Sequence, residues 1–266
     1  MILLFVFVFV FLLVVGHLFY WQTREGAPIT PKFFAHRGIK VNSPENTLAS
    51  YKEAIDLGFN GIEMDVCSLG DGTIVCSHNY DLERETNGFG WLNDLDYSEL
   101  NNIKTGIKNH PKNKQPIPRL IDVLNELPEK TFLNIEIKYK DFFDLSTAKA
   151  IGQLSKKKII EQPFLVSSFN PFIIAYLKIF HREIFLGYLI ENNKWSWLIN
   201  ILHPDFIHPD GVLINQGFLD KCNAHKIKIN AWTINSISSI EWCKKNNISS
   251  IITDNPEVLK YKYEKR

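Results

Sequence analysis

Three carboxylates lie where an alternating strand pattern would turn them toward one another. In the segments 61–66 and 133–138, apolar residues alternate with polar ones, so Glu63 and Asp65 share one face of the first segment and Glu136 lies on the polar face of the second. Adjacent strands lie about 4.8 Å apart, which would let the three acids converge. Buried carboxylates at that spacing repel one another unless a cation lies between them. The pattern therefore predicts a site for one hard divalent cation, Mg²⁺ or Ca²⁺, with oxygen ligands.

Two basic side chains provide an alternative to the metal. Arg37 follows the first expected strand, and Lys138 ends the strand that carries Glu136. Both could pair with the acids directly and form internal salt bridges without any metal. Arg37 also offers a planar fork that suits phosphate oxygens. From the residues alone, both interpretations stay open.

Two histidines add the groups needed for proton transfer. His36 follows the apolar segment 33–35, and His78 ends the segment 73–78. Histidines with a pKa near neutrality can act as a general base and a general acid if both stand at the mouth of one barrel. A purely structural role is the alternative for each of them.

Short apolar segments, most of them separated by plausible helices, would have to position these residues. Helices are expected at 47–57, 120–127 and 235–246, from their apolar periodicity and their boundary residues. Eight strand–helix units in about 235 residues favour an α/β fold of the TIM (β/α)₈ barrel type, with a doubly wound open sheet as the fallback. The expected strands are Phe33–Ala35, Gly61–Val66, Leu133–Lys138, Phe164–Ser168, Ile184–Leu189, Gly211–Ile214, Lys228–Thr233 and Ser250–Thr253.

One segment should depart from the barrel pattern. Only Leu69–Gly72 separates the second strand from 73–78. That turn is far too short for a parallel crossover, so 73–78 should return as the antiparallel partner of a hairpin. The loop-rich residues from about 79 to 118 are then expected to form a small insertion between the second strand and its helix.

The N-terminal segment differs in composition from the rest of the chain. Residues 2–21 are almost wholly apolar and as a helix would extend roughly 30 Å, the thickness of a hydrocarbon core. Tyr20 and Trp21 would suit the membrane interface. A cleaved signal peptide is the alternative, although the segment lacks a basic start. Positive charges that begin at Arg24 favour a cytoplasmic catalytic domain, with the chain as a single-pass membrane protein.

These observations divide the chain into three expected parts: a transmembrane anchor at 1–22, a linker at 23–31 and a catalytic domain at 32–266 that contains the insertion. A formal net charge of +1 argues against a nucleic-acid-binding protein, which usually has a basic face. The four cysteines are scattered and include no CxxC pair, so neither a cysteine zinc site nor a disulfide framework is expected.

Taken together, the short motifs resemble those of the glycerophosphodiester phosphodiesterase family in order and spacing. The resemblance covers about residues 33–259, and although each motif alone is weak, the full series is specific. The motifs are His36-Arg37-Gly38, Pro44-Glu45-Asn46-Thr47, Glu63-x-Asp65, His78, Thr86-Asn87-Gly88, Glu136-Ile137-Lys138, Ser168-Phe169, Trp232-Thr233-x-Asn235 and Thr253-Asp254-x-Pro256.

The resemblance implies a TIM barrel and a role for each matched residue. It implies metal ligation by Glu63, Asp65 and Glu136, acid–base catalysis by His36 and His78, phosphate binding by Arg37 and Lys138, and a substrate pocket that includes Glu45, Asn46, Phe169 and Trp232. One position departs from the family, which commonly has His-Asp where this chain has His78-Asn79. If that Asp orients the histidine, Asn79 would lower the pKa of His78 and the rate.

The implied reaction is metal-dependent hydrolysis of a glycerophosphodiester to glycerol phosphate and an alcohol, with His36 as the base and His78 as the acid. A lysophospholipase D that acts on lysophospholipids drawn from a membrane is the alternative, since 195–202, Phe89 and Trp91 could form an apolar surface. A catalytically silent, membrane-anchored lipid-binding barrel is a third hypothesis. It is disfavoured because such a protein has little need for both histidines, three acids and two basic residues together.

Overall fold

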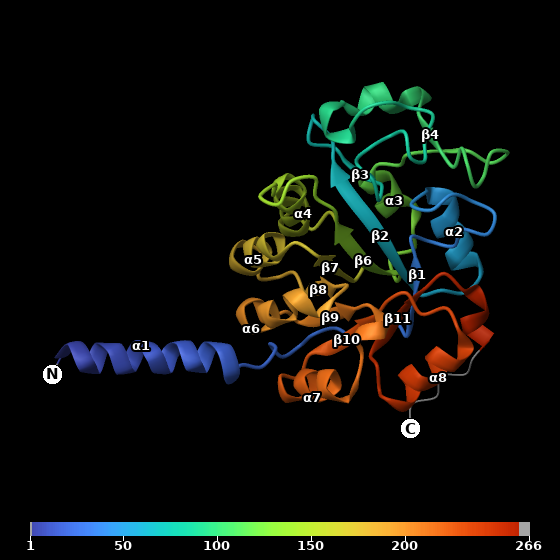
Figure 1. Cartoon of the computed structure of the whole chain (residues 1–266). Helices are drawn as coiled ribbons and strands as arrows, with labels where there is room; N and C mark the ends of the chain where they lie inside the picture. Colours follow the sequence, from blue (N-terminus) through green and yellow to red (C-terminus); the bar gives the residue numbers. More distant parts are fainter. Residues whose placement is uncertain (1, 261–266) are drawn as a thin grey trace.

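The computed structural model describes residues 2–260, with side chains from Leu4 onward, and shows a closed barrel of eight parallel strands (Figure 1). The sheet runs from β1 through β11, β10, β9, β8, β7 and β6 to β2, and β2 pairs again with β1. The predicted TIM barrel is therefore confirmed. The barrel strands are β1 (Phe33–His36), β2 (Gly61–Ser68), β6 (Phe132–Ile137), β7 (Phe164–Ser168), β8 (Leu186–Ile190), β9 (Phe206–Pro209), β10 (Lys228–Ala231) and β11 (Ser250–Thr253).

Helices cover the outside of the barrel, and their ends follow the capping residues of the sequence. In α2 the Thr47 side chain accepts from Ser50 N while the Ser50 side chain accepts from Thr47 N, which forms a capping box. Gly58 then takes a positive φ of 102° just beyond the helix. The helices around the barrel are α2 (Leu48–Asp56), α3 (Leu120–Glu126), α4 (Ser146–Lys156), α5 (Pro171–Phe180), α6 (Ile199–Leu202), α7 (Gln216–Ala224) and α8 (Ile237–Lys245).

Strand alternation separates the core from the site. On β2, Ile62, Met64 and Val66 are fully buried in the large core cluster, which also includes residues of the surrounding helices. Glu63 and Asp65 point to the opposite face, the barrel interior. A second cluster fills the interior near the starts of the strands, where it closes that end of the barrel; it consists of Phe34, Phe132, Leu165, Phe206 and Ile252.

The hairpin after β2 is confirmed. β3 (Ile74–Cys76) pairs antiparallel with β2, with Val66 opposite Cys76. The segment that follows contains a short ladder of β4 (Lys104–Thr105) with β5 (Gln115–Pro116) and lies beyond the end of β2 (Figure 1). Its apolar residues pack into a cluster separate from the barrel core, formed by Cys67, Leu69, Val75, Tyr80, Leu82, Leu92, Leu100 and Ile117.

One predicted strand is wrong. Residues 211–213 form a 3-10 turn, and the barrel strand is β9, which lies just before it. Asp210 caps this turn by accepting from Val212 N, and the Val212 side chain is 86% exposed. The sequence pattern of β9 did not predict a strand, because His208 is a polar residue that points into the interior and Pro209 lacks an N–H.

The prediction of a single-pass membrane protein is wrong. Among the residues that the structure describes, no helix is both long and apolar enough to cross a membrane. α1 ends at Phe19, and its 18 residues extend about 27 Å at ~1.5 Å each, short of a roughly 30 Å core. Trp21, expected at a membrane interface, is instead buried against the barrel, where its ring stacks on His203 at 4.2 Å and on His225 at 4.3 Å. The predicted cytoplasmic orientation was inferred from that anchor and so loses its basis.

The segment expected to be a linker packs along the starts of the barrel strands. Arg24 forms two 2.9 Å bonds with the carboxylate of Asp205, just before β9. Lys228 Nζ donates to the carbonyls of Ala27 and Pro28. The predicted boundary between linker and catalytic domain near residue 32 stays a prediction, and the predicted limits at Met1 and Arg266 lie outside the described residues.

Candidate active site

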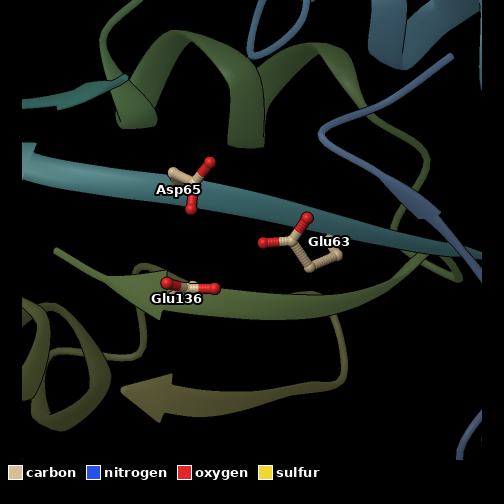
Figure 2. A group of neighbouring side chains, drawn as sticks. All are labelled: Glu63, Asp65 and Glu136. Carbon is tan, nitrogen blue, oxygen red and sulfur yellow. The ribbon is translucent and has the colours of Figure 1, made fainter. Parts of the chain in front are cut away.

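Three carboxylates converge inside the barrel (Figure 2). Glu63 and Asp65 come from β2 and Glu136 from β6, where Asp65 and Glu136 are register partners. One ligand oxygen from each lies within 4.8 Å of the others, and all three residues are buried. The alternation of the two strands thus brings the acids together as the sequence predicts.

The three carboxyl groups of the cluster differ in the direction in which their pKa is shifted. Burial, reinforced by Asp65 and Glu136, raises the pKa of Glu63 well above its usual value, and burial also raises the pKa of Glu136. Burial pushes the pKa of Asp65 upward too, but Lys138 and Arg37 outweigh it and bring that pKa down to about 2. The site therefore holds one firmly ionised carboxylate beside two that resist ionisation.

Arg37 and Lys138 form ion pairs with the acids, which is the predicted alternative to a metal. Lys138 Nζ lies 2.7 Å from Glu136 Oε1 and 3.6 Å from Asp65 Oδ1, and Arg37 Nε lies 2.9 Å from Asp65 Oδ2. Arg37 Nη1 also donates to Glu45 Oε1 at 2.6 Å. Acidic neighbours raise the pKa of both basic groups even though burial opposes this, so both stay cationic.

These ion pairs leave part of the carboxylate cluster unsatisfied. Within the described part of the chain, neither Glu63 Oε1 nor Asp65 Oδ1 has a hydrogen-bond partner, although both are buried. Glu63 Oε2 accepts only from the backbone N–H of Arg37, at 2.9 Å. Unpaired buried carboxylate oxygens beside two further carboxylates suit a hard divalent cation, so the residues present fit such an ion.

A tight turn after β1 positions Arg37. Arg37 and Gly38 have positive φ values of 56° and 77°. A Cβ on Gly38 would come within 2.8 Å of the Ser50 backbone, so only glycine fits there. The turn directs the Arg37 N–H toward Glu63 and its guanidinium toward Asp65. The His-Arg-Gly motif thus positions Arg37 against the carboxylate cluster.

Asn46 holds Asp65 in place. Its side chain donates to Asp65 Oδ2 at 2.9 Å and accepts from Asp65 N at 3.0 Å, while Tyr51 donates to the same amide oxygen. Asn46 was predicted to line the substrate pocket, but it is buried behind the carboxylates. Glu45, also predicted there, contacts Arg37 and Lys40 outside the main cavity.

The two histidines have different partners. His36 Nδ1 lies 2.8 Å from Asp254 Oδ1, and Lys40 and Asn235 bond the same carboxylate. His36 and Lys40 lower the pKa of Asp254 against the effect of burial, which keeps it ionised. Asp254 belongs to the Thr-Asp-x-Pro motif, from which no role in the site was predicted. Only its distance from His36 in the fold reveals the pairing.

His78 has the weaker partner. Its Nδ1 lies 2.9 Å from Asn79 Oδ1. The pKa of His78 is lowered chiefly by burial, with Lys138 and Arg37 acting in the same direction. The Asn79 bond opposes the shift, so the expected low pKa is present but arises mainly from the surroundings of His78.

An open cavity of about 590 Å³ joins these groups. Its size lies within the range of roughly 300–1,000 Å³ typical of small-molecule sites. Phe169 and Trp232 contact each other edge-to-face at 5.5 Å, and Trp232 Nε1 donates to His208 O. Of the predicted site residues, those that line the cavity are His36, Arg37, Glu63, His78, Glu136, Lys138, Phe169 and Trp232.

Comparison with known proteins agrees with this geometry. Residues 36–258 match the model of the glycerophosphoryl diester phosphodiesterase family. A glycerophosphodiester phosphodiesterase of Caldanaerobacter subterraneus subsp. tengcongensis is 31% identical over 230 residues, which cover 85% of this chain and 94% of that protein. Glycerophosphodiester phosphodiesterase 1 of Rattus norvegicus is 26% identical over 265 residues, covering 83% of this chain and 76% of the relative.

Solved structures show the same fold. An Oleispira antarctica phosphodiesterase, in complex with the product sn-glycerol-3-phosphate, superposes with a TM-score of 0.77 and 27% identity, over 86% of this chain and 95% of that one. A glycerophosphodiester phosphodiesterase from Thermotoga maritima superposes with a TM-score of 0.69 and 25% identity, over 88% and 99% of the two chains.

Proposed function

This chain belongs to the glycerophosphoryl diester phosphodiesterase family, and on that premise we propose that it hydrolyses glycerophosphodiesters to glycerol phosphate and an alcohol. The observation that carries the proposal is the convergence of two acids, two histidines and two basic residues on one cavity, with Asp65 completing the carboxylate cluster beside it. A silent lipid-binding barrel would have no use for the buried Glu63 Oε1, which has no hydrogen-bond partner among the described residues.

One divalent cation, Mg²⁺ or Ca²⁺, would be held by Glu63, Asp65 and Glu136 and would supply Lewis-acid stabilisation of the phosphate charge. Arg37 and Lys138 would bind the phosphate oxygens from the same side of the cavity. Because their acidic neighbours keep both cationic, they remain available to stabilise the charge that develops in the transition state.

The two histidines would carry the proton transfers. Asp254 holds the Nδ1 side of His36, which leaves Nε2 as the atom that takes a proton from the nucleophile. His78, at the same cavity, would donate a proton to the leaving alcohol. Asn46 is buried and fixes the orientation of Asp65, so its role would be positioning.

The assignment of His36 can be tested with three variants and glycerophosphocholine as the substrate. His36→Ala should lower kcat about 10²- to 10⁴-fold. Asp254→Asn should lower kcat at least about tenfold with little change in KM, because it disturbs the orientation of His36 and not substrate binding. Asp220→Asn makes the same chemical change at an exposed position of α7 and should leave kcat unchanged. A folded His36→Ala protein with wild-type kcat would refute the assignment.

A further inference from the structure

The active-site cavity has two unlike walls. One side carries the charged groups described above. The other side comes from the ends of β6, β7, β8 and β10 and is mostly aromatic or aliphatic, apart from Glu191 and Asn192. Its apolar lining includes Tyr139, Phe142, Phe169, Tyr188, Leu189 and Trp232. A phosphodiester with a small polar alcohol would use the charged wall and leave much of the apolar wall without a partner.

The apolar wall continues beyond the cavity. Phe142 lines the cavity edge and contacts Phe172 at 5.2 Å and Phe143 at 5.9 Å between ring centroids. Phe143 and Phe172 lie 4.9 Å apart. We call Phe142, Phe143 and Phe172 the aromatic rim. Their exposed fractions are 43%, 76% and 42%, so this rim is an aromatic surface open to solvent and continuous with the site.

Hydrogen bonds hold the backbone that carries the aromatic rim. Asn170 is fully buried, and its side chain donates to Phe142 O at 2.8 Å. The same side chain accepts from Phe172 N at 2.9 Å and so caps α5. Asn170 therefore ties the loop after β6 to the start of α5. The aromatic rings are exposed although their two segments are held together, which distinguishes them from side chains of a loose loop.

We propose that the apolar wall and the aromatic rim bind an alkyl or acyl chain of the substrate. The preferred substrates are then glycerophosphodiesters that carry such a chain, with the phosphate at the charged wall and the chain running past Phe142 to Phe143. This inference rests on the proposed function and narrows its substrate class. Chain burial against aromatic rings supplies binding free energy in proportion to the apolar area removed from water.

The chain could be attached at either end of the phosphodiester. In a lysophospholipid it sits on the glycerol, and in a glycerophosphoalkanol it forms the leaving alcohol. In both cases the alkyl or acyl chain would contact the aromatic rim. Two substrate series with chains of six, eight and ten carbons, used below their critical micelle concentrations, distinguish these sources. Glycerophosphocholine, which has no chain, reports the basal reaction.

The test measures kcat/KM of the full chain for glycerophosphocholine and for both series. We expect kcat/KM to rise with chain length in at least one series, by up to roughly fourfold per buried methylene. The double variant Phe143→Ala/Phe172→Ala should flatten this dependence and leave glycerophosphocholine hydrolysis and the Tm unchanged. Phe180→Ala removes a comparably exposed ring from the other end of α5 and should leave the chain-length dependence intact.

Three outcomes would overturn the inference. Glycerophosphocholine hydrolysis with no chain-length dependence in either series would reject the subsite and leave the proposed function standing. A chain-length dependence that survives in the double variant would reject the rim as its source. No hydrolysis of any substrate by folded, metal-loaded protein would reject the proposed function as well.

Discussion

At the scale of single residues, the site is a set of charges held by specific neighbours, and the sequence reveals the charges better than the neighbours. Strand alternation places Glu63, Asp65 and Glu136 on one face because it depends only on local geometry. The contact between His36 and Asp254 joins residues 218 positions apart, and no local pattern predicts it. Asn46 was predicted to line the pocket because its motif identifies a position in the sequence but does not show where the side chain points.

We expect Glu63 to lower the stability of the metal-free protein and to be needed for activity as a metal ligand. A carboxyl whose pKa is raised on folding costs stability as the pH rises above its unfolded value near 4.5, because the folded protein then binds a proton that the unfolded chain releases. Metal-free Glu63→Gln should therefore have a higher Tm than the metal-free parent at pH 8. With saturating Mg²⁺ or Ca²⁺ its kcat/KM should be at least about 100-fold lower, because a metal ligand is weakened.

The control for this variant is Glu126→Gln, which changes an exposed carboxylate on α3 that pairs with Lys52 at the surface. It should alter neither quantity appreciably. An unchanged kcat/KM for Glu63→Gln would show that Glu63 is no metal ligand.

Asn79→Asp should shift the pH dependence. A carboxylate at Nδ1 of His78 favours its protonated form and raises the pKa that burial lowers. If His78 donates the proton to the leaving alcohol, the alkaline limb of kcat/KM against pH should move to higher pH. Asn246→Asp adds the same charge at the C-cap of α8 and should not move it. Movement of the acid limb instead would assign His78 as the base.

At the scale of elements, the order of strands and helices could largely be predicted because most barrel strands are short segments rich in apolar residues and followed by a turn. The hairpin of β2 and β3 followed from the length of one turn. β9 was missed because an interior histidine and a proline interrupt its apolar pattern, while the more apolar segment behind it is a turn. α1 was misjudged because apolar composition alone does not show where a helix ends or what its last turn contacts.

Arg24 should stabilise the barrel from outside its strands. Its fork binds Asp205, whose side chain is nearly buried and also accepts from Leu186 N at the start of β8. Arg24→Ala should lower the free energy of unfolding by about 1–3 kcal/mol, since it leaves a charged acceptor short of donors. Lys52→Ala removes an exposed ion pair with Glu126 and should cost less than about 1 kcal/mol. Equal losses in denaturant titrations would contradict this role for the segment before β1.

At the scale of the whole molecule, the two ends of the barrel have different tasks (Figure 1). The end at the carboxyl termini of the strands holds the carboxylates, the histidines and the cavity, as is usual for this fold. The opposite end is closed by the cluster around Phe34 and crossed by the residues between α1 and β1. Changes at the closed end should therefore alter stability before they alter chemistry.

The most direct test of the proposed metal-dependent reaction is the metal dependence of glycerophosphocholine hydrolysis. The full chain would be stripped with a chelator, checked for folding by circular dichroism, and assayed for glycerol phosphate before and after addition of Mg²⁺ or Ca²⁺. We predict a loss of at least about 100-fold on stripping, restored by one of the two ions, because the Lewis-acid stabilisation of the phosphate charge is lost with the ion. Full turnover by the folded, metal-free protein would contradict the account.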